Sequence, residues 1–207
     1  MCGQAEGVAT WYLRLNGYLT TTNFILHPEM GTVQETDVDV LAVRFPWRRE
    51  TAGDELIDDA WVRDDGEVVS VVVAEVKKTG PCRLNGPTRD PERRNLQRVL
   101  GALGAFAPNQ VHTVAGALYA RGAWRNHDPR ALLCCFGAEV SPPLSRDLPE
   151  CQQLTWSNVA QFIHRRFTTH MDQKKQHQQW DDLGQWLWRW ATSVNGPEFE
   201  RKLREVL

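Results

Sequence analysis

The sequence lacks several features that would assign a protein class directly. No apolar run is long enough to span a bilayer. The N-terminus has neither the basic region nor the apolar stretch of a signal peptide. Glycine-rich phosphate loops and dinucleotide fingerprints are also missing, which argues against a nucleotide-driven enzyme. These absences predict a cytoplasmic protein with no membrane contact.

Charge of one sign is not in excess, because 24 Lys and Arg face 26 Asp and Glu, for a net charge of −2. Any binding to a polyanion must therefore come from a local patch. The 5 cysteines follow no metal-site spacing. Their odd number, and the adjacent Cys134 and Cys135 in an apolar run, predict reduced thiols that fill the core, except at Cys2.

The run Val-Val-Val-Ala-Glu-Val-Lys-Lys-Thr at residues 71–79 predicts a strand, because it is rich in β-branched residues and closes at Gly80-Pro81. Side chains alternate along a strand, so Glu75 and Lys77 share a face with Val71 and Val73. Charged groups at the end of so apolar a strand either emerge into solvent or lie buried, and burial is costly unless they are paired or bound to a metal.

A second predicted strand, at residues 35–43, begins with acids and ends with apolar residues. Glu35, Asp37 and Asp39 alternate onto one face. If the two strands are neighbours, an aspartate and a glutamate come together and repel each other unless a cation lies between them. Mg²⁺ prefers such oxygen ligands, and an adjacent lysine supplies positive charge for a phosphate or an attacking water.

These residues resemble the PD-(D/E)xK nuclease superfamily, which has the restriction-endonuclease-like fold. Asp39 is followed by Val-Leu-Ala-Val, and Glu75-Val76-Lys77 closes the next core strand. The order also fits: a helix, the strand with the aspartate, the strand with Glu-x-Lys, another helix and a further strand. No proline precedes the acid, so Asp37 and Asp39 both remain candidates, with Asp39 preferred because the apolar strand follows it directly.

The resemblance implies an α/β fold with a central mixed sheet of about five strands flanked by helices. Residues 1–140 form the expected nuclease-like core, with an inserted loop at 47–66 whose acids, among them Asp58 and Asp59, are interpreted as solvated. Residues 141–207 form the expected helical extension, which packs on that core.

The resemblance also implies a metal-dependent nuclease, a hydrolase that cleaves phosphodiester bonds and uses Mg²⁺, with Mn²⁺ as a substitute. The implied catalytic residues are Asp39, Glu75 and Lys77. The implied metal ligands are Asp39, Glu75, Asp37 and Glu6. Glu6 is the only acid of a first helix predicted at residues 4–16, and its alternative role is that of a solvated acid in a first helical turn.

The most basic part of the chain starts at this motif. Between Lys77 and Arg98, only Asp90 and Glu92 oppose the basic side chains. This stretch is either a phosphate-contacting patch or a solvated helix face with a charged loop. The candidate nucleic-acid-binding residues are Lys78, Arg83, Arg89, Arg93, Arg94, Gln97 and Arg98, with Gln97 included because some superfamily members place a glutamine at this site.

Other elements follow from periodicity and punctuation. Strands are predicted at 18–26, 111–119 and 130–140, with an irregular loop at 80–90 and a connector at 141–149. Asp90 and Pro91 are typical of a helix start, with Leu96, Val99 and Leu100 on its core face. A later helix begins near Ser157 and has an apolar stripe at Val159, Phe162, Ile163 and Phe167.

The last segment has Trp180, Leu183, Trp186, Leu187 and Trp190 at helical spacing. It is interpreted as core, or alternatively as a homodimer or partner-protein contact.

The expected partner is DNA rather than RNA, on the resemblance alone, and roles in defence, repair and recombination all suit such a nuclease. The alternative is a non-cleaving module that binds nucleic acid or protein within a larger complex, in which Glu75 and Lys77 merely pair.

Overall fold

The computed structural model describes residues 3–26, 36–48, 58–63, 68–125, 128–169, 171–176, 179 and 181–207. Cys2, Glu35 and Trp180 lie outside the described residues, as do the side chain of Asp37 and parts of the expected 47–66 loop.

A mixed sheet of 6 strands forms the centre of the described chain, which confirms the expected α/β class. The strands are β1 Leu19–Leu26, β2 Thr36–Arg44, β3 Ser70–Val76, β4 Ala123–Trp124, β5 Arg130–Gly137 and β6 Gln152–Thr155. Their order is β1-β2-β3-β5-β4, and β6 also pairs with β5. β1, β2 and β3 are antiparallel neighbours, whereas β3 and β5 run parallel. The sheet thus continues past residue 140, through β6.

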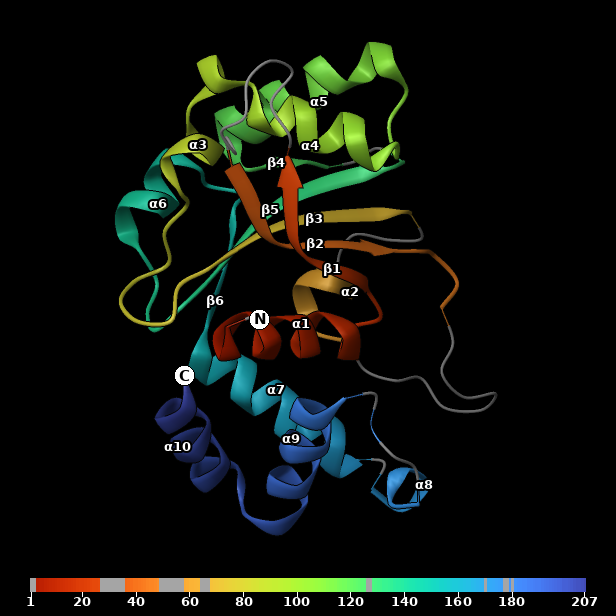
Figure 1. The fold of residues 1–207 in the computed structure, drawn as a ribbon, viewed down its shortest axis with the longest axis vertical. Coiled ribbons are helices and arrows are strands. Elements are labelled where there is room, and N and C mark those ends of the chain that lie inside the picture. Colours follow the sequence, from red (N-terminus) through yellow and green to blue (C-terminus); the bar gives the residue numbers. More distant parts are fainter. Residues whose placement is uncertain are drawn as a thin grey trace.

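Helices cover both faces of the sheet (Figure 1). They are α1 Gln4–Leu15, α2 Ala60–Arg63, α3 Gly86–Arg89, the 3₁₀ helix η1 Pro91–Arg93, α4 Asn95–Leu103, α5 Pro108–Arg121, α6 Pro142–Asp147, α7 Trp156–Thr169, α8 Met171–Lys174, α9 Asp182–Ser193 and α10 Gly196–Val206. α4 and α5 cover one face, and α1 and α7 cover the other, with α9 and α10 packed on α7. None of the described helices is both long and apolar enough to cross a membrane.

Each face of the sheet has its own hydrophobic core, and β3 contributes to both. Val72 and Ala74 pack on the face covered by α1 and α7, whereas Val71 and Val73 pack beneath α4 and α5. Residues 70–75 of β3 are all buried. β3 is therefore buried on both sides, as its run of valines predicts, because helices cross over both faces of a parallel pair.

The strand predicted at residues 111–119 is wrong, because this segment lies inside α5. Its β-branched residues favour a strand, but Val114, Ala115 and Leu118 are buried at helical spacing against the sheet. Pro108 opens the helix, and Gly122, with φ of 90°, closes it. Burial of one helical stripe outweighs the weak preference of single residues.

The helix expected to begin at Pro91 is divided in two. Asp90 caps η1 as predicted, by accepting a hydrogen bond from the Glu92 amide. Arg94 then adopts a left-handed backbone conformation, with φ of 55°, and α4 starts after it. Leu96, Val99 and Leu100 are buried as expected. The loop predicted at 80–90 contains α3, and the connector predicted at 141–149 contains α6.

Two acids of the expected solvated loop are structural instead. Asp58 is buried, and one of its carboxylate oxygens lies 2.7 Å from an Arg44 guanidinium nitrogen. Asp59 accepts a hydrogen bond of 2.5 Å from the Tyr12 hydroxyl. The two acids hold α2 against β2 and α1, so the prediction of solvation is wrong for them. Nothing in the local sequence marks these two acids as structural, because their partners lie far along the chain.

The four described cysteines, Cys82, Cys134, Cys135 and Cys151, are buried free thiols. This confirms their predicted role as core residues, since free cysteine behaves as a small apolar side chain when buried.

The C-terminal helices pack on the α1 face of the sheet. The predicted stripe of α7, together with Leu187 and Trp188 of α9, is buried with residues of α1. Asp181 caps α9 by accepting from the Gly184 amide, and it also accepts a 2.8 Å hydrogen bond from the Trp11 indole. One carboxylate thus joins the start of α9 to α1.

Replacement of Gly184 tests this contact. A Cβ at position 184 would overlap the Trp11 ring, so Gly184→Ala should lower the free energy of unfolding by about 1–3 kcal/mol. Gly101→Ala is the matched control, because a Cβ at this helical position meets nothing within 4 Å. The control should gain up to about 1 kcal/mol. Urea unfolding measures both, and equal stabilities would contradict the close approach of α9 to α1.

Candidate active site

Asp39 and Glu75 lie on neighbouring strands at the same edge of the sheet. The β2–β3 register pairs Val40 with Ala74, so Asp39 is the next residue toward Glu75 across the strands. The regular ladder ends at that pair, and the Asp39 carboxylate, through Oδ2, accepts a 2.7 Å hydrogen bond from the next free β3 amide, that of Val76. Asp39 lies two residues before Leu41 and Glu75 two residues after Val73, and Leu41 and Val73 both pack beneath α4 and α5, so the two acids share that face.

Glu75 is a fully buried acid, with 0% of its surface exposed. Its Oε1 accepts a 2.6 Å hydrogen bond from the Thr88 hydroxyl of α3, and its Oε2 lies 3.4 Å from Lys77 Nζ. On its other side, the parallel register places Glu75 next to Cys135 of β5. Glu75 is therefore enclosed by β5 and α3, and its carboxylate has polar partners on both oxygens.

Lys77 follows β3 directly and is held at both ends. Its backbone amide donates to the Phe136 carbonyl at 2.9 Å, which continues the parallel ladder with β5. Its ammonium group donates to the Asn85 side-chain oxygen at 2.8 Å and to Glu75. Asn85 stands immediately before α3, so the same short helix supplies a partner to each member of the Glu75–Lys77 pair.

Burial raises the pKa of Glu75 to about 7 and is the largest cause of the shift, opposed by the Thr88 hydrogen bond. The negative charge of Asp39 raises this pKa further, and Lys77 lowers it. At neutral pH the carboxyl is therefore divided between its protonated and ionised forms. A second positive charge close by would favour ionisation, which is what a bound cation supplies.

The carboxylate oxygens of Asp39 and Glu75 suit a cation that takes few protein ligands. Among the residues that the structure describes, no group of three or more His, Cys, Asp or Glu side chains could hold a metal ion. Two carboxylates are nevertheless the usual protein contribution to Mg²⁺, which keeps several waters and binds substrate phosphate. The buried Glu75 beside Asp39 fits that requirement.

Glu6, one of the two other expected metal ligands, does not lie beside this pair. Glu6 lies on α1, which packs on the opposite face of the sheet, and its carboxylate accepts a 2.9 Å hydrogen bond from the Gly3 amide at the helix start. This is the alternative role expected of an acid in a first helical turn. The backbone of Asp37 lies in β2, opposite Ile25 of β1, and its side chain is outside the described residues.

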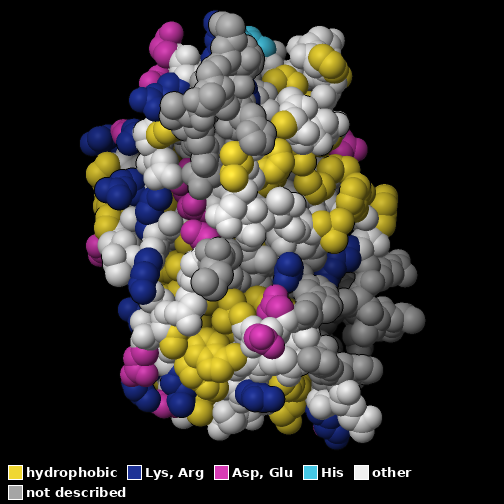
Figure 2. Space-filling model, in the orientation of Figure 1, with side chains coloured by type: hydrophobic (Ala, Val, Ile, Leu, Met, Phe, Trp, Pro, Cys, Tyr) yellow, Lys and Arg dark blue, Asp and Glu magenta, His cyan; other side chains and the backbone are white. Residues whose placement is uncertain are grey.

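The predicted basic patch is partly neutralised. Arg89 pairs with Asp147 at 2.9 Å, and Arg93 lies 3.4 Å from Asp90. Lys78, Arg83 and Arg94 are exposed, and Arg98 is partly buried. Figure 2 shows Lys and Arg side chains along the edge that carries α3 and α6, interspersed with acidic side chains. The patch flanks the candidate site without being uniformly positive.

Sequence reasoning missed Thr88 and Asn85, which contact the two central side chains. The only local signal was Asn85-Gly86-Pro87, a typical turn or helix start within the segment predicted as a loop. No pattern indicates that this turn folds back onto the end of β3, because that contact depends on how the loop closes.

Comparison of the chain with protein-family models, with curated proteins and with solved structures finds no match. The geometry of these side chains is therefore the basis for assigning a function.

The raised pKa of Glu75 makes stability depend on pH. The folded protein holds this proton more tightly than the unfolded chain, so the stabilisation is complete below about pH 4.5 and is lost as the pH rises through about 7. The free energy of unfolding of Glu75→Gln, relative to the native protein, should therefore rise by about 3 kcal/mol across this range. Urea unfolding at several pH values measures it.

Glu200→Gln, on α10, is the control for removal of one glutamate charge elsewhere. A difference between Glu75→Gln and the native protein that stays constant with pH would contradict the raised pKa.

Proposed function

We propose that this chain is a metal-dependent nuclease that hydrolyses phosphodiester bonds of nucleic acid, with DNA as the expected substrate. One observation carries the proposal: Asp39 and the buried Glu75 meet across β2 and β3, with Lys77 Nζ 3.4 Å from Glu75. Phosphodiester hydrolysis requires a positioned water and positive charge near the phosphate oxygens. This cluster brings together two carboxylates that can bind a cation and the ammonium group of Lys77.

The arrangement of elements supports the same proposal. Helix α1 precedes the antiparallel strands β1, β2 and β3, and α4 and α5 then lead to β5, which lies parallel to β3. The superfamily that the Asp39 and Glu75-Val76-Lys77 motifs resemble has its helix, acidic strands, helix and further strand in this order. In such a crossover, the helices cover the face that carries the acids.

Asp39 and Glu75 are the residues that would hold Mg²⁺ or Mn²⁺. A cation bound there would lower the pKa of a water and polarise a phosphate oxygen. Thr88 holds the Glu75 carboxylate in place, and Asn85 does the same for Lys77. An ammonium group has three N–H donors, and within the described residues Glu75 and Asn85 accept two of them. The third can donate to the attacking water or to a phosphate oxygen.

Exposed basic residues can contact the phosphate backbone beside this site. Lys78 follows Lys77 directly, and Arg83 lies on the loop that leads to α3. Contacts of this kind position a strand without reading its sequence. The proposal therefore includes no sequence specificity.

A cleavage assay tests the proposal. The protein is incubated with supercoiled plasmid, linear duplex, single-stranded DNA and RNA, with Mg²⁺, Mn²⁺ or EDTA. Lys77→Ala should lower the cleavage rate at least about 100-fold, because the charge aimed at the phosphate is lost. Lys175→Ala, an exposed lysine that pairs with Asp172, is the matched control and should cleave normally.

Metal-dependent cleavage that survives in Lys77→Ala would defeat the assigned roles. An absence of cleavage on every substrate would defeat the nuclease proposal for the isolated chain.

One observation favours the second candidate, a module that binds nucleic acid or protein without cleaving. Both Glu75 oxygens already have protein partners, Thr88 at 2.6 Å and Lys77 at 3.4 Å. A network of this kind can also have a purely structural role, closing the end of β3 over its core. Under this alternative, no metal binds at Asp39 and Glu75.

Calorimetry with Mn²⁺ separates the two candidates. A nuclease site should bind Mn²⁺ in the native protein, and Asp39→Ala should abolish the binding, because one of two carboxylate ligands is lost. Asp147→Ala, which removes an exposed carboxylate paired with Arg89, is the control and should bind normally. Lack of Mn²⁺ binding by the native protein would favour the non-cleaving module.

A further inference from the structure

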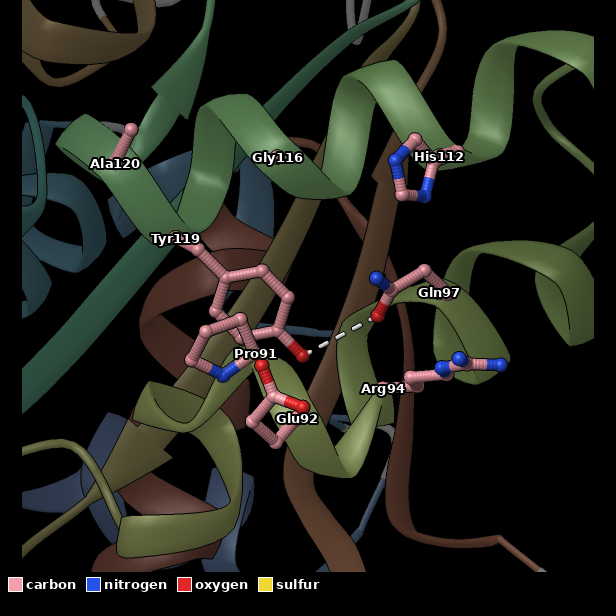
Figure 3. A pocket seen from close by; sticks show the side chains of 8 residues that line it. All are labelled: Pro91, Glu92, Arg94, Gln97, His112, Gly116, Tyr119 and Ala120. Carbon is pink, nitrogen blue, oxygen red and sulfur yellow. Dashed lines mark hydrogen bonds between the residues drawn. The ribbon is translucent and has the colours of Figure 1, made fainter.

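A pocket of about 450 Å³ lies between η1, α4 and α5, on the face of the sheet that carries Glu75 and Lys77 (Figure 3). Its lining residues are Pro91, Glu92, Arg94, Gln97, His112, Gly116, Tyr119 and Ala120. The pocket lies close to α3 along the chain, because its lining residue Pro91 comes three residues after Thr88, the hydrogen-bond partner of Glu75. A nucleic-acid strand that passes over α3 can therefore continue into this pocket.

The α5 wall of the pocket has a gap between two aromatic rings. His112, Gly116 and Tyr119 are four and three residues apart, so they fall on one side of the helix. Gly116 leaves the middle position open, since a Cβ there would meet nothing within 4 Å. A flat ring can approach the α5 backbone at Gly116, with His112 on one side and Tyr119 on the other (Figure 3).

The opposite wall presents an oriented amide. The Tyr119 hydroxyl accepts a 3.0 Å hydrogen bond from the Leu96 amide and donates at 3.3 Å to Gln97 Oε1. Because the oxygen of Gln97 is held by Tyr119, its Nε2 lies on the side that faces α5 (Figure 3). A glutamine amide in such a position can form hydrogen bonds with the edge of a nucleobase.

The charges of the pocket select against other ligands. Glu92 in the lining disfavours a phosphate, and Arg94 opposes the binding of a cation. The described residues also contain no cluster of side chains that could hold a metal there. The pocket is lined by one acidic side chain, one basic side chain, two aromatic rings and an amide, and this lining suits a neutral ring with polar edges better than an ion.

We propose that this pocket binds one unpaired nucleobase of a single-stranded nucleic acid, stacked over Gly116 between His112 and Tyr119 and hydrogen-bonded to Gln97. The choice of a nucleic acid rests on the proposed function, whereas the choice of a planar polar ring rests on the pocket itself. Stacking on aromatic side chains is a usual way to hold single-stranded bases.

The test measures binding in EDTA, so that cleavage cannot occur. The probes are a short fluorescent single-stranded oligodeoxyadenylate and an abasic strand of the same length and charge. The native protein should bind the first more tightly, by about 10-fold or more, the amount expected for one stacked base. Gly116→Leu, whose side chain fills the gap, should bind both strands with the affinity that the native protein has for the abasic strand.

Gly101→Leu is the matched control, because it also adds a side chain at a helical glycine where a Cβ meets nothing within 4 Å. It should bind like the native protein, and circular dichroism should show both variants folded. Equal binding of oligodeoxyadenylate by the native protein and Gly116→Leu would overturn the proposal. The proposal would also be overturned if Gly116→Leu abolished the binding of free deoxyadenosine monophosphate but left the binding of the single-stranded oligonucleotide unchanged.

The outcome is independent of the cleavage assay. Base-dependent binding without any cleavage would retain the pocket and reject the nuclease. Metal-dependent cleavage with strand binding unaffected by Gly116→Leu would retain the nuclease and reject the pocket.

Discussion

The burial of the Glu75 carboxyl is the constraint on which this end of the molecule depends. An acid with no exposed surface needs hydrogen-bond donors, and Thr88 and Lys77 supply them at 2.6 Å and 3.4 Å. To bring Thr88 there, the chain after β3 must turn back as α3, and the same turn brings Asn85 to Lys77. One buried group thus determines the path of the loop that covers it.

That path also connects the two proposed sites. α3 leads into η1, and the left-handed Arg94 then separates η1 from α4. The separation opens the space against α5 in which Gln97 and Tyr119 meet. Non-glycine residues in this conformation are uncommon and concentrate at functional sites. The proposed cation site and the proposed base pocket lie on one face, which suits a single nucleic-acid strand that crosses both.

Several elements could be predicted because their signals are local. The valines of β3 require burial on both faces, and the stripe of α7 at Val159, Phe162, Ile163 and Phe167 has helical spacing. The β-branched residues of α5 misled the prediction, because the choice between helix and strand was made by packing against the sheet. Glu6 is expected at the site because the resemblance implies an acid on the first helix and Glu6 is the only acid there, but neither point reveals the face of the sheet that the helix covers.

The sequence by itself determined that an acid and a lysine stand at the end of a buried strand and that an aspartate opens the preceding one, because alternation and apolar runs are local properties. Only the tertiary structure decided that Asp39 lies beside Glu75, that Thr88 and Asn85 enclose the pair, and that Gly116 faces Gln97 across a pocket. Some of those contacts join residues that lie far apart in the chain, and others depend on how the turn before α3 closes. They therefore depend on strand register and helix packing, which are not local properties of the sequence.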